Sequence, residues 1–250
     1  MKLVLKFGGT SLASPKDITN VAKTVASFSK GNEIVVVCSA VDGVTDDLIL
    51  ISKMIEQKKE KDVAKTLDEL IKKHRKLAMQ TIKNSEIEAP LMEKLNADVS
   101  ELQELVRGLT LLKEVSARSL DYLVSFGERL SDDLVSFALQ DLKKKSTALN
   151  GKEVGIVTDS NFGESRPLMD TTKIRISKTL GSLLSKKIIP VVGGFAGADQ
   201  HGNITTFGRG GSDYTATIIA SCINADEVWL MSDVDGLMTC LLYTSDAADE

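Results

Sequence analysis

Short runs of β-branched and other apolar residues recur along the chain, with longer amphipathic stretches between them. The runs predict strands buried on both faces, at residues 3–7, 33–38, 154–157, 188–192 and 227–231. Apolar residues at helical spacing predict crossover helices at residues 15–28, 171–186 and 212–223. This alternation predicts an α/β fold in which helices cover both faces of a mostly parallel sheet.

A different pattern occupies about residues 45–141. Leu, Ile, Met and Val recur there every three or four residues among Lys, Glu and Gln, with almost no Gly. This pattern predicts a long helical insertion. Its charge runs, such as residues 58–62, are typical of solvated helix faces, and we assign them no function.

Charge and hydropathy exclude several classes of function. With 31 Lys and Arg against 35 Asp and Glu, the formal charge is -4 and no basic stripe is present, which argues against a nucleic-acid partner. Lys2 and Lys6 interrupt the first apolar run, which therefore does not match a signal peptide. No window approaches the roughly 18 apolar residues of a membrane span. We expect a cytoplasmic protein with no membrane partner.

The cysteines and histidines predict no cross-link. Cys38, Cys222 and Cys240 are scattered and form no CxxC pair. His74 and His201 do not complete a metal-ligand spacing with them. We expect neither disulfides nor a metal site in the protein.

The first predicted strand runs directly into a glycine-rich turn, Lys6-Phe7-Gly8-Gly9-Thr10-Ser11. The turn can be a phosphate cradle built from backbone N–H groups, or a tight turn that needs glycine only for its backbone freedom. A lysine in a buried strand is costly without a partner charge, so the Lys6 ammonium should emerge at the strand end, where ligands collect in open α/β sheets. No Walker motif or protein-kinase signature is present.

Two further glycine-rich turns occur later in the chain. Residues 207–213, Phe-Gly-Arg-Gly-Gly-Ser-Asp, end where an amphipathic helix begins, and Ser212 or Asp213 can act as its N-cap. The positive end of that helix should face an anion. Residues 192–197 form the third turn. Three such turns in one sheet favour a phosphate-handling site over packing alone.

Five motifs occur in a characteristic order: KFGGTS at 6–11, VCSAVDGVTD at 37–46, SFGERLS at 125–131, GRGGSD at 208–213 and SDVDG at 232–236. Together they resemble the aspartate kinases of the amino-acid-kinase superfamily. The resemblance runs from residue 1 to about residue 239 and includes the helical insertion. It implies a three-layer α/β sandwich of the amino-acid-kinase, carbamate-kinase-like type with a mostly parallel central sheet.

The resemblance also implies roles at the phosphate end of the site. Lys6 matches the lysine that stabilises the transferring phosphoryl group, and Asp213 matches the carboxylate that orients Lys6. Gly8 and Gly9 match backbone donors to the same oxygens. The remaining residues that match the family's nucleotide site are Phe7, Ser11, Ser232, Asp233, Asp235, Gly236 and Met238. Met238 stands where many relatives have a Tyr beside the adenine, and an apolar Met can still pack on a base. Asp233 and Asp235 can instead form a turn with Gly236.

At the amino-acid end, the resemblance places Ser39 and Thr45 near the substrate. Glu128 matches the acceptor for its α-ammonium, and Arg209 the partner of its α-carboxylate. Without the motif, Glu128 reads as a solvated helix residue, and Ser39 and Thr45 as caps or turn residues. The neighbours that belong to the same substrate-binding turn are Gly210, Gly211 and Ser212.

The implied activity is ATP-dependent phosphorylation of the side-chain carboxylate of L-aspartate, the first step towards lysine, threonine and methionine, with Mg²⁺ carried by the phosphates. A sister enzyme, N-acetylglutamate kinase or glutamate 5-kinase, is the nearest alternative. An N-acetyl group offers no cation to Glu128, which argues against an acetylated substrate. A silent module that binds nucleotide or amino acid is the other alternative, and the intact Lys6, Arg209 and Asp213 set argues against it.

The resemblance stops after about residue 239. We expect residues 240–250 to be a foreign or read-through sequence in place of the family's continuation. By resemblance, the full-length protein would carry C-terminal ACT domains, absent from this chain, and would form a homo-oligomer.

Overall fold

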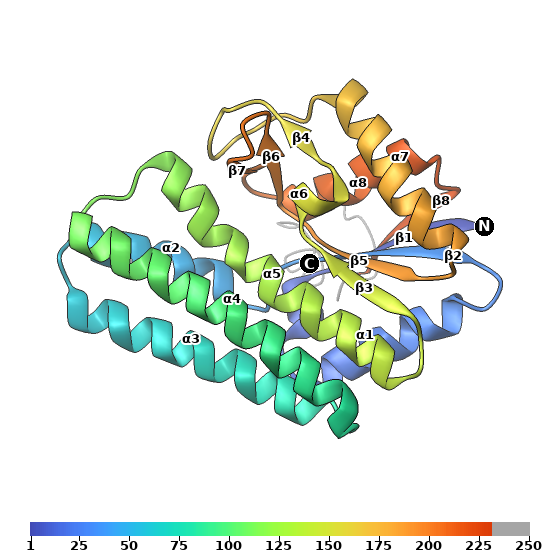
Figure 1. Ribbon diagram of the computed structural model, residues 1–250, viewed down its shortest axis with the longest axis horizontal. Coiled ribbons are helices and arrows are strands. Elements are labelled where there is room, and N and C mark those ends of the chain that lie inside the picture. The colour runs from blue at the N-terminus through green and yellow to red at the C-terminus, as the bar shows by residue number, and fades with distance from the viewer. Residues whose placement is uncertain (232–250) are drawn as a thin grey trace, which may run out of the picture.

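Five parallel strands form the main sheet of the computed structural model, which describes residues 1–231 (Figure 1). In spatial order they are β3 (Ser146–Leu149), β5 (Ile189–Gly193), β2 (Glu33–Cys38), β1 (Lys2–Phe7) and β8 (Glu227–Met231). The four strands predicted at residues 3–7, 33–38, 188–192 and 227–231 are confirmed.

The central strands β1 and β2 are buried on both faces, as their continuous apolar runs predict. Leu3, Leu5 and Phe7 belong to one hydrophobic core, and Val4 belongs to the other. This alternation follows from the two-residue period of a strand. It places Lys6 on the same face as Val4, towards α8 (Gly211–Ile223), whose apolar residues share that core.

The strand predicted at residues 154–157 is wrong. Asn150 and Glu153 form a capping box that starts a helical turn, α6 (Gly151–Val154). Gly155 ends this turn with a left-handed φ of 105°, which glycine adopts without strain. Only β4 (Val157–Thr158) remains extended.

A second, three-stranded sheet has the order β4-β6-β7. Its hairpin, β6 (Ala196–Asp199) and β7 (Ile204–Thr206), is antiparallel. Neither strand is predicted from the sequence, because Gly, Ala and Thr in such short runs give no apolar signal. The hairpin leads directly into the glycine-rich turn that precedes α8.

Helices cover both faces of the main sheet (Figure 1). The predicted crossover helices are confirmed as α1 (Pro15–Phe28), α7 (Met169–Ser185) and α8. Ser14 caps α1 by accepting a hydrogen bond from the backbone N–H of Asp17, and Pro15 occupies its first position. α7 and α8 pack on one face, and α1 and α5 (Ala117–Asp141) on the other.

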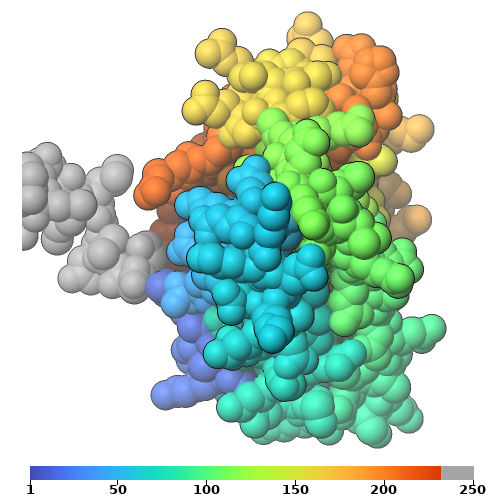
Figure 2. All heavy atoms as spheres, turned by 90° about the vertical axis from the view of Figure 1, so that its left-hand side faces the viewer, coloured from blue at the N-terminus to red at the C-terminus, as the bar shows by residue number. Residues whose placement is uncertain are grey.

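The helical run predicted at residues 45–141 is confirmed as α2 (Val44–Glu56), α3 (Glu60–Thr81), α4 (Ser85–Leu112) and α5. The cyan and green atoms of these helices form much of the surface in the side view of Figure 2. α5 packs against β3 and β5 as well as α4, so it belongs to the layer that covers the sheet. Its buried residues include four acids: Asp121, Glu128, Asp132 and Asp133.

Gly127→Ala should lower the free energy of unfolding by about 1–3 kcal/mol, because overpacking forces neighbouring groups to shift. A Cβ at this position of α5 would lie 2.8 Å from the Cβ of Ala40. Gly108→Ala on α4 is the matched control, since a Cβ there meets nothing within 4 Å. It should raise stability by about 0.4–1 kcal/mol. Urea unfolding measures both, and equal stabilities would contradict this packing.

Candidate active site

A cavity of about 320 Å³ lies at the carboxyl ends of β1 and β2 and beside the amino end of α8. This is the edge of a parallel sheet where ligands bind. The predicted residues that line it are Lys6, Gly9, Ser39, Thr45, Glu128, Arg209, Gly210, Gly211, Ser212 and Asp213. Gly8 lies beside Lys6, because a Cβ on it would be 3.9 Å from the Lys6 Nζ. Thus segments up to about 200 residues apart in the chain meet in one cavity.

Two predicted nucleotide residues lie elsewhere. The Phe7 side chain is buried in the core beneath the sheet, so only its backbone faces the turn. Ser11 lies in the short 3₁₀ helix Gly9–Leu12 and donates its backbone N–H to Gly8. Neither lines this cavity. The predictions for Ser232, Asp233, Asp235, Gly236 and Met238 fall outside the described residues.

Lys6 and Asp213 form an ion pair at the mouth of the cavity. Their Nζ and Oδ1 atoms lie 2.8 Å apart, and the lysine side chain is 15% exposed. The Lys6 ammonium therefore emerges at the strand end, as its cost in the interior predicts. Asp213 lies in the first turn of α8, where a carboxylate also interacts favourably with the helix dipole.

The start of α8 differs from the expectation that Ser212 or Asp213 caps it. Gly210 is the N-cap, with a left-handed φ of 78°, and in the described structure no side chain caps this end. Gly211 must approach closely, since a Cβ on it would lie 2.8 Å from the Phe195 ring. The positive end of α8 consequently borders the cavity without a capping side chain, an arrangement suited to an anion.

Glu128 is buried, and one of its oxygens has no partner in the described part of the chain. Oε1 accepts a 3.2 Å hydrogen bond from the backbone N–H of Ala40. Oε2 has no hydrogen-bond partner among residues 1–231. Burial raises the pKa of Glu128 to about 8. Glu128 is therefore not a solvated helix residue. A cation close to its buried carboxyl group would favour the ionised form.

The connection from β2 to α2 is held against α5. The Ser131 hydroxyl donates a 2.7 Å hydrogen bond to the Ser39 carbonyl, next to the Ala40 N–H that Glu128 accepts. Lys73 of α3 donates from Nζ to the Asp42 carbonyl at 2.5 Å. Sequence reasoning did not single out Ser131, although it ends the SFGERLS motif, and Lys73 gives no sequence signal.

Arg209 is exposed and forms no ion pair with any residue of the described chain. It comes from the turn before α8, whereas Glu128 comes from α5, and both line the same cavity. The site thus offers a carboxylate acceptor and a guanidinium fork on separate elements. A guanidinium is suited to bidentate recognition of a carboxylate.

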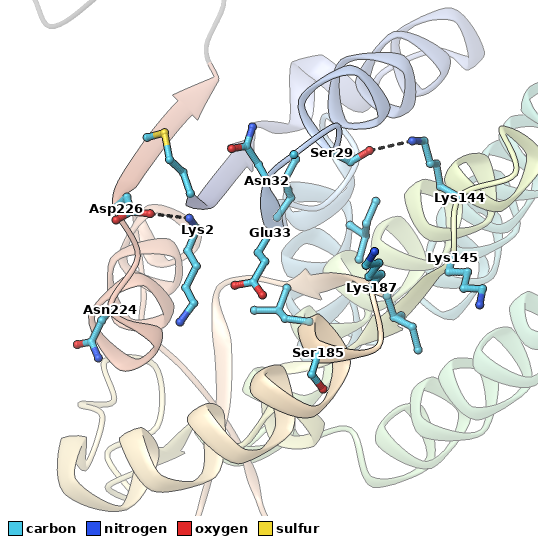
Figure 3. Close-up of a pocket in the computed structure, with 16 residues that line it drawn as sticks. Lys2, Ser29, Asn32, Glu33, Lys144, Lys145, Ser185, Lys187, Asn224 and Asp226 are labelled. Atoms are coloured by element: carbon cyan, nitrogen blue, oxygen red, sulfur yellow. Dashed lines mark hydrogen bonds between the residues drawn. The ribbon is translucent and has the colours of Figure 1, made fainter.

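A larger cavity of about 790 Å³ lies at the opposite edge of the sheet (Figure 3). Lys2, Lys144, Lys145 and Lys187 surround it. The Nζ atoms of Lys2 and Lys144 donate to the Ile223 carbonyl and the Ser29 hydroxyl, groups at the ends of α8 and α1. Lysines near helix carboxyl ends are favoured by the helix dipole, so these charges need no ligand to explain them.

Neither a metal cluster nor a membrane span was found in the residues that the structure describes. No group of three or more His, Cys, Asp or Glu side chains among them could hold a metal ion. No helix in residues 1–231 is long and apolar enough to cross a bilayer.

Comparison with known proteins gives the family. The model described as "Amino acid kinase family" matches residues 1–241. This chain belongs to the amino acid kinase family. The fold agrees, since the chain superimposes on E. coli aspartokinase III in complex with aspartate and ADP with a TM-score of 0.84, at 26% identity over 94% of this chain and 50% of that chain.

Two curated relatives of this amino acid kinase chain are aspartokinases. Aspartokinase 3, chloroplastic, of Arabidopsis thaliana is 35% identical over 95% of this chain and 42% of that protein. The aspartokinase of Geobacillus stearothermophilus is 30% identical over 95% of this chain and 44% of its own length. The chain therefore spans less than half the length of these relatives.

Glu128→Gln should change how the stability of this amino acid kinase depends on pH. Because burial raises the pKa of Glu128 from 4.5 to about 8, the folded state keeps a proton that the unfolded chain releases within this window. The free energy of unfolding of the wild type should fall relative to that of the variant as pH rises, by up to about 1.4 kcal/mol per pH unit. Urea unfolding between about pH 5 and pH 8 measures the two slopes, and parallel curves would contradict the burial of Glu128.

Proposed function

We propose that this chain catalyses transfer of the γ-phosphoryl group of ATP to the side-chain carboxylate of L-aspartate, forming 4-phospho-L-aspartate. The observation that carries the proposal is the Oε2 of Glu128, which has no partner among residues 1–231, in the cavity that also contains the Lys6–Asp213 pair. The names of the relatives support it, as does the E. coli aspartokinase III structure with aspartate and ADP.

The amino-acid end of the substrate is recognised by two opposite charges. The α-ammonium binds Glu128 and supplies the cation that its buried carboxylate lacks among residues 1–231. The α-carboxylate binds Arg209 through a bidentate fork. Ser39 and Thr45, which line the same cavity, contribute hydroxyls near the substrate. Binding at both ends orients the side-chain carboxylate for attack.

At the phosphoryl end of the site, the transfer reaction needs positive charge but no general base. The nucleophile is a carboxylate that is already ionised at neutral pH, so no proton has to be removed from it. The main barrier to attack by this carboxylate is repulsion from the anionic phosphate. The Lys6 ammonium offsets this repulsion, and Asp213 holds the ammonium in place. The amino end of α8, with the backbone N–H groups of Gly210 and Ser212, and the backbone N–H groups of Gly8 and Gly9 add donors to the phosphate oxygens.

Mg²⁺, bound to the phosphates of ATP, would neutralise part of their charge. Proteins typically bind Mg²⁺ through substrate phosphates together with one or two carboxylates. Assembly of the full-length protein into a homo-oligomer and its place in the cytoplasm stay predictions.

The activity is tested by trapping the acyl phosphate with hydroxylamine, with L-aspartate, L-glutamate and N-acetylglutamate offered in turn. The assay uses this chain and a version extended by the C-terminal region of the Geobacillus stearothermophilus aspartokinase. Turnover selective for aspartate supports the proposal. Preference for N-acetylglutamate or L-glutamate would replace the substrate and keep the phosphoryl transfer. No turnover of any substrate in either version would favour a binding module.

Lys6→Ala should reduce kcat at least about 100-fold, because it removes a preorganised charge from the developing phosphoryl transition state. Asp213→Asn should cause a smaller loss, since it leaves the ammonium present but less firmly oriented. Lys65→Ala is the matched control, a lysine whose side chain is 77% exposed. Steady-state kinetics at saturating ATP and aspartate measure all three, and near-normal turnover by Lys6→Ala would exclude its role.

A further inference from the structure

We infer that Asp121 is a positioning residue for amino-acid recognition: it holds the turn that carries Arg209 in a fixed place relative to Glu128. The inference rests on the proposed function, because it assigns Arg209 to the substrate's α-carboxylate. Asp121 does not line the cavity and is 2% exposed. It acts through the segments that it binds.

Three hydrogen bonds tie the Asp121 carboxylate to segments far away in the chain. Oδ2 accepts from the backbone N–H groups of Gly163, at 2.9 Å, and Thr206, at 2.8 Å. Oδ1 accepts from the Thr206 hydroxyl at 2.8 Å. Thr206 is 85 residues away in sequence and is the last residue of β7. A buried carboxylate that accepts three bonds is a strong local constraint.

Both bound segments support the turn with Arg209. Phe207 follows Thr206 directly, and Arg209 comes two residues later. On the other side, the Gly163 carbonyl lies 3.0 Å from where a Cβ on Gly208 would be, so this segment packs directly behind the turn. Ser165 closes the arrangement by donating its N–H and hydroxyl to the Thr206 carbonyl, each at 2.9 Å.

The same helix carries the other half of the recognition site. Asp121 and Glu128 are seven residues apart on α5, which is two helical turns and roughly 10 Å along the axis, so they share a helix face. One rigid helix therefore sets the separation between the ammonium acceptor and the anchored end of the Arg209 turn. A fixed separation favours ligands whose ammonium and carboxylate groups share one carbon, as they do in α-amino acids.

Two variants distinguish the hydrogen bonds of Asp121 from its charge. Asp121→Ala removes both, and Asp121→Asn removes the charge alone. The amide oxygen of Asn can accept both backbone N–H bonds, and its NH₂ can donate to the Thr206 hydroxyl, so Asp121→Asn should stay within about threefold of the wild type in KM for aspartate. Asp121→Ala should raise this KM at least about 10-fold and change the KM for ATP by less than about threefold. Thr206→Val, which removes only the hydroxyl bond, should fall between them.

Asp141→Ala is the matched control. Asp141 ends the same helix and accepts the backbone N–H groups of Lys83 and Asn84, away from the cavity. It should lower the melting temperature without a rise in the KM for aspartate. If Asp121→Ala behaved in the same way, Asp121 would be a purely structural residue and the inference would be wrong.

Hydrogen exchange separates this inference from the proposed function. Amides of residues 207–213 should exchange faster in Asp121→Ala than in Asp121→Asn or Asp141→Ala, whether or not aspartate is the substrate. Unchanged exchange in this segment would overturn the positioning role. Faster exchange without turnover of aspartate by the wild type would keep the positioning role and remove the proposed substrate.

Discussion

Burying an ionisable carboxylate without a cation is unfavourable, and the candidate site depends on such a group. Glu128 is buried, its Oε2 has no partner among residues 1–231, and its pKa is raised to about 8. A fold selected only for stability would place an apolar residue at this position. The chain instead keeps a carboxylate that a bound ammonium would compensate, so part of the binding free energy of such a ligand would go to ionising Glu128.

α5 connects the parts of the site. It carries Glu128 in the cavity, Ser131 against the Ser39 carbonyl and Asp121 against the end of β7. These contacts lie on one helix packed against both the sheet and α4. Since turns are less rigid than the elements they connect, hydrogen bonds to a packed helix are a direct way to hold two of them at a fixed separation.

Local patterns in the sequence predict the main helices and strands, but they do not predict the contacts between distant segments. Apolar runs identify β1 and β2, and apolar residues at helical spacing identify α1 with both of its ends. Because a lysine is costly inside a buried strand, its ammonium is expected at the strand end, and Lys6 does line the cavity there. The β6–β7 hairpin escapes prediction because its short runs of Gly, Ala and Thr lack an apolar period.

The candidate site is also only partly predictable from the sequence. The glycine turns and the helix start after them can be read from sequence, but the cap at Gly210 cannot, because it depends on how the turn packs against Phe195. The burial of Glu128 is also invisible locally, since α5 has charged residues on several faces and only tertiary packing decides which of them lose water. Asp121 gives no sequence signal, because its partners lie 42 and 85 residues away.

Glu128 should be a neutral, buried acid until an ammonium binds it. A ¹³C NMR titration of its carboxyl carbon, assigned with Glu128→Gln and recorded with and without L-aspartate, tests this directly. We predict an apparent pKa of about 8 for the free protein, and a value below about 6 when aspartate saturates the site, as expected for a carboxylate that gains a close cation. An ordinary pKa in the free protein, or a raised pKa that aspartate leaves unchanged, would contradict the account.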